Sequence, residues 1–134
     1  MMSFTESIST CLLEKMMTTN GRATRSEYWW YVLFTNLVQP LILVGYSISV
    51  SAITSIDNGI FQSLLAVMMV LLSLCQILLF LSSICVAIRR VHDIGLSGWW
   101  FILILIPIGN LILMLLLLKD SEKNDNKYGE YPVL

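Results

Sequence analysis

Arg89-Arg90-Val91-His92-Asp93-Ile94-Gly95-Leu96-Ser97-Gly98-Trp99-Trp100 is a short polar segment between two long apolar runs. It contains two of the four arginines, the single histidine and two of the four tryptophans of the chain. An arginine pair followed by a tryptophan pair is typical of a helix end at a membrane surface. Cations contact headgroups there, and indole rings lie between water and lipid. We interpret this segment as the point around which the rest of the chain is arranged.

The composition indicates that this segment belongs to a membrane protein. Of the 134 residues, 57% are hydrophobic and only 13% are charged, and the mean hydropathy is +0.78. A soluble domain of this size has too little interior to bury so much apolar surface. The excess lies in three charge-free runs, at residues 28–56, 58–88 and 94–118. Each is longer than the roughly 20 residues that cross a bilayer as a helix. The sequence therefore predicts an all-α integral membrane protein.

We expect a single membrane domain, residues 1–134, with three spans. An amphipathic helix is expected within residues 1–20, followed by membrane spans at residues 28–54, 60–88 and 97–118 and a polar tail at residues 119–134. The first helix is too short and too polar to cross the bilayer. It can lie flat in the interface or pack on the protein, and packing is favoured because Lys15 is its only base. No cleavable signal peptide is expected, because no unbroken apolar core follows a basic start.

Charge asymmetry predicts the orientation of the first two spans. The turn Asp57-Asn58-Gly59 between them carries no Lys or Arg, whereas Lys15 and all four arginines lie on the other side. The positive-inside rule then places the amino terminus and the opening segment in the cytoplasm. Thr24 or Ser26 is suited to cap the first span, with Glu27 in its first turn.

The third apolar run allows two arrangements. The stretch from Trp99 to Leu118 is long enough for one crossing, but Pro107-Ile108-Gly109-Asn110 interrupts it. A re-entrant hairpin that turns there would return the tail lysines to the cytoplasmic side, and charge asymmetry favours it. The length of the run favours one span, as does the need to satisfy backbone groups inside the bilayer. We predict a bundle of three transmembrane helices, the third broken at Pro107–Asn110, and keep the hairpin as the alternative.

Polar side chains gather on one face of each of the first two spans. These two stripes comprise Asn36, Gln39, Tyr46, Ser47 and Thr54 in the first span and Gln62, Ser73, Gln76 and Ser83 in the second. Small and amide side chains on one face are how membrane helices contact each other, so we expect the stripes to meet. A polar path for a solute has less support, because no charged residue lies at mid-membrane.

Few residues suggest catalysis or metal binding. His92-Asp93 resembles a fragment of a catalytic set, but no second histidine and no serine nucleophile motif accompany it. With Glu27 or Glu14 the pair makes a poor ligand set for zinc. The three cysteines lack metal or redox spacing. The net charge of −1 gives no indication of nucleic-acid binding. We predict no enzymatic activity, no cofactor and no metal.

Three motifs resemble one known family, the domain-of-unknown-function 805 family. Gly21-Arg22-Ala23-Thr24-Arg25-Ser26-Glu27-Tyr28-Trp29 is similar to the family's Gly-Arg-x-x-Arg-x-Glu-(Phe/Tyr)-Trp start. Arg89-Arg90-Val91-His92-Asp93 followed by Ser97-Gly98-Trp99-Trp100 resembles its Arg-Arg-Leu-His-Asp and Ser-Gly-Trp-Trp signature, and Ile106-Pro107-Ile108-Gly109 fits its apolar break. The tail keeps Asn126, Tyr128, Gly129 and Pro132 of the family ending, but Ser121-Glu122-Lys123-Asn124 replaces a glycine- and proline-rich turn. The resemblance covers about residues 15–132. It implies a small bacterial inner-membrane protein with a few helical spans, and no particular activity.

The first functional hypothesis is a non-enzymatic structural or interaction protein of the bacterial inner (plasma) membrane, multi-pass, with its amino terminus in the cytoplasm. Arginine binds phosphate and carboxylate in a fork, and basic clusters at this interface hold lipid headgroups. We predict a cytoplasmic face that contacts anionic headgroups, a partner membrane protein or a second copy of the chain. Its residues are Arg22, Arg25, Glu27, Arg89, Arg90, His92, Asp93, Trp99 and Trp100. The alternatives are a small transporter or channel component lined by the polar stripes and, with least support, an enzyme using His92 and Asp93.

Overall fold

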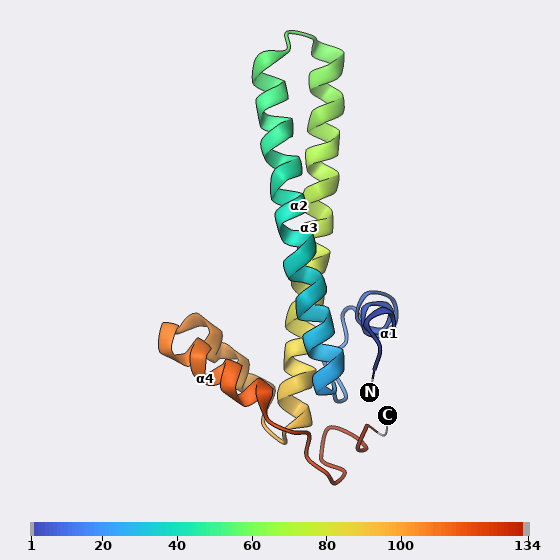
Figure 1. Cartoon of the computed structure of the whole chain (residues 1–134), viewed down its shortest axis with the longest axis vertical. Helices are drawn as coiled ribbons and strands as arrows, with labels where there is room; N and C mark the ends of the chain where they lie inside the picture. Colours follow the sequence, from blue (N-terminus) through green and yellow to red (C-terminus); the bar gives the residue numbers. More distant parts are fainter. Residues whose placement is uncertain (1, 133–134) are drawn as a thin grey trace.

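Two long helices side by side dominate the fold, and the shorter elements gather at one of their ends (Figure 1). The computed structural model describes residues 2–132. Helix α2, Arg25–Ser55, and helix α3, Gly59–Asp93, form an antiparallel hairpin. Both are long and apolar enough to cross a membrane. We call the end where α2 begins and α3 ends the base of the hairpin, and the opposite end its tip.

Side-chain caps explain where the two long helices begin. Thr24, one of the two caps that the sequence suggested, accepts a hydrogen bond from the backbone N–H of Glu27 at 3.2 Å. At the tip, the side-chain Oδ1 atom of Asn58 accepts from the backbone N–H groups of Ile60 and Phe61 at 3.1 Å each. Such bonds satisfy N–H groups that have no partner within the helix. Both long helices therefore begin directly after a residue of a type that commonly caps helices.

The polar stripes of α2 and α3 meet in part. Gln76 Nε2 donates to Gln39 Oε1 at 3.1 Å, and the hydroxyl groups of Tyr46 and Ser73 lie 2.6 Å apart. For these pairs the prediction of contact between the stripes is confirmed. It is wrong for three residues of the first stripe, which are exposed and bond only to carbonyl oxygens of their own helix: Asn36, Ser47 and Thr54.

The N-terminal segment is a short helix that packs against the base. Helix α1, Phe4–Ser9, continues as the π-helical turn η1, Thr10–Glu14. Figure 1 shows α1 end-on, so its axis runs across the long hairpin. Ser7 Oγ donates to the carbonyl oxygen of Glu27 at 2.6 Å, and Ser82 Oγ donates to that of Cys11 at 2.8 Å. The expectation that this helix packs on the protein is confirmed.

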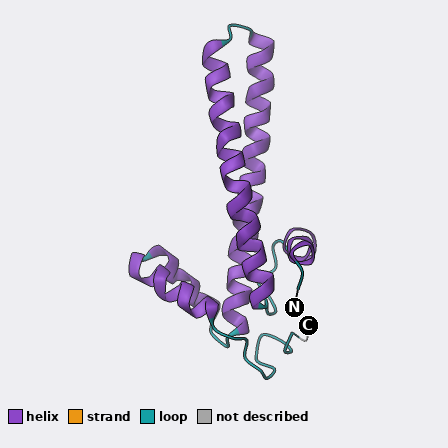
Figure 2. Ribbon diagram, viewed as in Figure 1, coloured by secondary structure: helices purple, strands orange, loops and turns teal. Residues whose placement is uncertain are grey.

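The third apolar run does not form a third long helix, so the prediction of a third crossing at residues 97–118 is wrong. The run folds into the 3₁₀-helix η2, Gly98–Leu105, and helix α4, Pro107–Leu118, which pack together as a short hairpin (Figure 2). Pro107 starts a new helix and holds Ile106 in an extended conformation, which interrupts the run. The 12 residues of α4 extend about 18 Å, less than the roughly 30 Å of a bilayer core. The hairpin alternative describes this segment.

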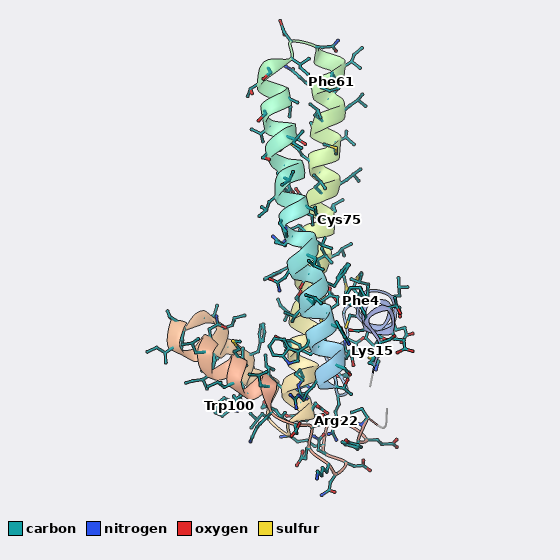
Figure 3. The ribbon with its side chains drawn as sticks, viewed as in Figure 1. Phe4, Lys15, Arg22, Phe61, Cys75 and Trp100 are labelled. Carbon is teal, nitrogen blue, oxygen red and sulfur yellow. The ribbon has the colours of Figure 1, made fainter. Side chains whose placement is uncertain are left out.

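Buried side chains are concentrated at the base. One cluster joins Cys11, Ala23, Tyr31 and Val86, and a second joins Val91 with Leu113 and Leu117 of α4. Toward the tip, apolar side chains point outward (Figure 3); Leu41 is 70% exposed and Ile60 is 77% exposed. Such extensive apolar exposure fits helices surrounded by lipid and not by water. The polar tail follows α4 back to the base, where the N–H of Glu122 donates to the carbonyl oxygen of Asp93 at 3.0 Å.

Candidate functional site

Asp93, the last residue of α3, lies fully buried at the centre of the base. Its Oδ1 atom accepts from Arg22 Nε at 2.9 Å. Its Oδ2 atom accepts from Arg90, one helical turn earlier, and from the hydroxyl group of Ser121. One carboxylate therefore joins the segment before α2, the end of α3 and the tail.

The two arginines that contact Asp93 also hold the tail through its backbone. Arg22 donates to the carbonyl oxygens of Glu122 at 2.5 Å and Asn124 at 2.8 Å. Arg90 donates to the carbonyl oxygen of Leu117 at 3.2 Å and to that of Lys119. A buried guanidinium requires partners for its N–H groups, and here Asp93, the end of α4 and the tail supply them. The tail is thus part of the packed structure.

A second ion pair lies between α2 and α3. Arg89 NH1 donates to Glu27 Oε1 at 2.5 Å, and both side chains are buried. Cys11 lies against both, with its Sγ atom 3.7 Å from Arg89 NH2. Burial, followed by the nearby Glu27 carboxylate, raises the pKa of the Cys11 thiol to about 12. Because the thiolate is the reactive form, this cysteine is not an activated nucleophile.

The nine residues predicted to share one face do gather at the base, but five of them face inward. These five, which we call the ionic core, are Arg22, Glu27, Arg89, Arg90 and Asp93. The prediction that these five residues are presented at the surface is wrong. Each is buried and forms an ion pair with another member of the ionic core. Such burial is tolerated only when charged groups are paired and hydrogen-bonded.

Three of the remaining four residues are exposed. Arg25 forms an ion pair with Asp120, whose side chain is 86% exposed. Trp99 and Trp100 lie at the start of η2 with exposed indole rings. These three residues, and not the ionic core, are available to a ligand at the base.

His92 is engaged with the tail and not with Asp93. Its imidazole ring stacks on Tyr128, with 3.8 Å between ring centroids and 3° between ring planes. Burial lowers the pKa of His92 below its ordinary value. Both oxygens of Asp93 are occupied by Arg22, Arg90 and Ser121, so this carboxylate does not orient the imidazole. Within residues 2–132, no three His, Cys, Asp or Glu side chains lie close enough to hold a metal ion.

Several tail residues complete the site, although the sequence analysis did not include them in the predicted face. Asn126 Nδ2 donates to the carbonyl oxygen of His92 at 3.0 Å and to Glu122 Oε2 at 2.9 Å. Ser121 bonds to Asp93, and Tyr128 stacks on His92. The family-like ending that includes Asn126 and Tyr128 was the one signal that this tail is structured.

The comparisons with known proteins relate the chain to a family of inner membrane proteins. Residues 16–130 match the family described as protein of unknown function, DUF805. The chain is 31% identical over 115 residues to the inner membrane protein YhaI of Escherichia coli strain K12, an alignment that covers 84% of each chain. It is 32% identical over 115 residues to the inner membrane protein YhaH of the same strain, covering 85% of this chain and 86% of YhaH. No solved structure gives a significant match. These matches confirm the resemblance seen in the sequence motifs, and with the two long apolar helices they show that the chain is an inner-membrane protein of the DUF805 family.

Proposed function

We propose that this protein is a non-enzymatic interaction protein of the inner membrane whose preassembled cytoplasmic face binds anionic lipid headgroups. The observation that carries the proposal is that the ionic core is paired internally: Arg22 and Arg90 hold Asp93, the end of α4 and the tail, and Arg89 pairs with Glu27 between α2 and α3. The base is therefore a rigid surface whose exposed cations and indole rings surround a closed interior. A surface of this kind suits recognition of headgroups at the membrane boundary.

The proposed orientation places the base in the cytoplasm and the tip outside, with two crossings. Because α4 returns to the base, all eight Lys and Arg residues lie on that side of the two spans. The turn at the tip carries only the acidic Asp57. The positive-inside rule favours this arrangement more strongly than one with the tail outside. The exposed apolar surface of η2 and α4, with Leu105 78% exposed, suits insertion into the cytoplasmic leaflet beside the base.

The two alternative functions have weaker support in the geometry. A solute path between the spans would need free polar side chains, but Gln39 and Gln76 bond to each other, as do Tyr46 and Ser73. An enzyme would need an oriented acid and base, but Asp93 is committed to two arginines and a serine. Both observations favour an interaction role for the base.

Spin-labelled lipids test the proposal directly. The protein is reconstituted into vesicles that contain trace spin-labelled phosphatidylglycerol or phosphatidylcholine, and the motionally restricted fraction of each lipid is measured. We expect a larger restricted fraction for phosphatidylglycerol, and a smaller difference at high ionic strength because salt screens exposed charges. Equal restricted fractions for the two lipids at low salt would contradict the lipid-binding function.

A further inference from the structure

We propose that the cavity between the start of α2 and the tail binds one anionic glycerophospholipid. This inference rests on the proposed function and adds the location, the number of ligands and the residues that recognise them. The cavity has a volume of about 790 Å³, within the range of about 300–1,000 Å³ found for small-molecule sites. Helix α2 contributes Arg25, Trp30 and Leu33 to its lining, and the tail contributes Asp120, Lys123 and Tyr131.

The polar end of the cavity has one cation in excess. Arg25 pairs with Asp120, and Lys123 has no carboxylate within ion-pair distance in the described part of the chain. Two cations and one carboxylate thus line the same cavity. The Arg25–Asp120 pair is exposed, and exposed pairs contribute little stability. A phosphate group, which accepts several charge-assisted bonds from Arg and Lys, is therefore able to compete with Asp120 for Arg25.

The other end of the cavity is apolar and leads toward the membrane. Trp30 and Leu33 lie one helical turn apart on α2, and their side chains are 39% and 44% exposed. Tryptophan rings favour the headgroup level, so Leu33 lies on the hydrocarbon side of Trp30 in the proposed orientation. A ligand with a phosphate at one end and methylene groups at the other would contact both ends. A soluble phosphate would leave the apolar wall uncovered.

The tail closes the cavity on the side opposite to α2, and its position depends on the ionic core. Ser121 lines the cavity and also donates to Asp93. Arg22 holds the carbonyl oxygens of Glu122 and Asn124, on either side of Lys123. Lys123 is thereby held at the cavity that Arg25 also lines before any ligand binds. Such preorganisation reduces the entropic cost of binding.

Native mass spectrometry of the full chain tests this site. The protein is released from micelles that contain equal amounts of phosphatidylglycerol and phosphatidylcholine, and we expect one phosphatidylglycerol to be retained per chain. In Arg25→Gln/Lys123→Gln we expect its retention to fall about tenfold or more, because two charge-assisted contacts are lost. The matched control Lys15→Gln/Lys119→Gln removes two exposed charges at the base outside the cavity, and should retain the lipid. Arg25→Lys/Lys123→Arg keeps both charges and should also retain it, which separates loss of binding from loss of fold.

Each contrary result has a distinct meaning. Equal retention of phosphatidylglycerol and phosphatidylcholine by the unmodified protein would overturn both the proposed function and the site. Equal retention of phosphatidylglycerol by the Arg25/Lys123 variant and the Lys15/Lys119 control would overturn the site and leave the lipid-binding function standing. Displacement of the lipid by millimolar glycerol 3-phosphate would assign the cavity to a soluble phosphate ester and would overturn its assignment to a lipid.

Discussion

Asp93 is the residue on which the most segments of the chain depend. It contacts two guanidinium groups and one hydroxyl group, and these come from the segment before α2, from α3 and from the tail. The two arginines carry one more charge than this carboxylate neutralises. The two guanidinium groups also donate to carbonyl oxygens of the tail and to that of Leu117 at the end of α4. The stability of the base therefore depends on a single acidic side chain.

We expect Asp93→Asn to lower the free energy of unfolding by about 3–5 kcal/mol, because it leaves two buried cations without their counter-ion. The change should also release the tail. Both effects are measured in detergent, the first by thermal unfolding and the second by limited proteolysis of residues 119–132. Asp120→Asn makes the same chemical change at an exposed side chain and should alter stability by less than about 0.5 kcal/mol. Equal effects of the two substitutions would show that the ionic core does not stabilise the base.

His92 should make docking of the tail depend on pH. Burial lowers the pKa of this imidazole, so the folded state favours the neutral ring. The stabilisation is present above the ordinary pKa of about 6.5 and is lost as the pH falls through the lowered folded value. Lys127, with its ammonium group 5.0 Å from the ring centroid of Tyr128, also opposes protonation. We expect the protection of residues 120–130 against hydrogen exchange, measured relative to the intrinsic rate at each pH, to decrease between pH 7.5 and pH 5.

His92→Phe is the control for this pH dependence. Phenylalanine keeps an aromatic ring against Tyr128 but has no titratable group, and the chain has no other histidine. Exchange in this variant should vary with pH only as the intrinsic chemical rate does. If its protection relative to the intrinsic rate decreases between pH 7.5 and pH 5 as much as in the unmodified chain, His92 is not the responsible group.

At the scale of elements, the sequence predicted α2 and α3 well and the third apolar run poorly. Apolar runs of sufficient length, with Thr24 at the start of the first, were enough for the two long helices. For residues 97–118 the same criterion favoured one span. The outcome depends on contacts that the sequence does not reveal, such as the bond from Arg90 to the carbonyl oxygen of Leu117. The local break at Pro107 and this contact together fold the run back toward the base.

For the ionic core, too, the sequence predicted part of the arrangement and missed the rest. The motifs placed four arginines, His92 and Asp93 at one end of the spans, and the structure confirms that they gather there. The sequence did not predict their burial, because their partners in the tail are largely backbone carbonyl oxygens. Every residue carries such an oxygen, so no side-chain pattern marks the ones that arginines bind.

The η2–α4 hairpin should depend on the absence of a side chain at Gly109. A Cβ atom there would lie 2.6 Å from the carbonyl oxygen of Leu103 and 3.1 Å from the Cβ atom of Ile106. We therefore expect Gly109→Ala to open the hairpin, at a cost of about 1–3 kcal/mol. Spin labels at the exposed positions Ile102 and Leu115 should report a longer or broader distance.

Gly59→Ala is the control for the hairpin, because a Cβ atom at Gly59 would have no neighbour within 4 Å. It should leave the label distance between positions 102 and 115 unchanged. An unaltered distance distribution in Gly109→Ala would contradict the role assigned to close packing of η2 on α4.

At the scale of the whole molecule, the fold divides into a polar base with a packed interior and two long helices that depend on lipid. The base brings together the ionic core, both buried apolar clusters and the tail. Beyond it, α2 and α3 contact little besides each other. Because α4 returns to the base, all Lys and Arg residues lie at that end of the molecule. The charge pattern of the sequence therefore matches the division into a polar base and two apolar helices.

Cysteine accessibility tests this arrangement most directly. Glu130→Cys and Asp57→Cys are introduced separately after Cys11, Cys75 and Cys85 have been replaced by alanine, and each is treated with a membrane-impermeant maleimide. We predict that Glu130→Cys is labelled in inverted vesicles but not in intact spheroplasts, and that Asp57→Cys shows the reverse. Labelling of Glu130→Cys from outside intact spheroplasts would place the tail across the membrane from the base and contradict the account.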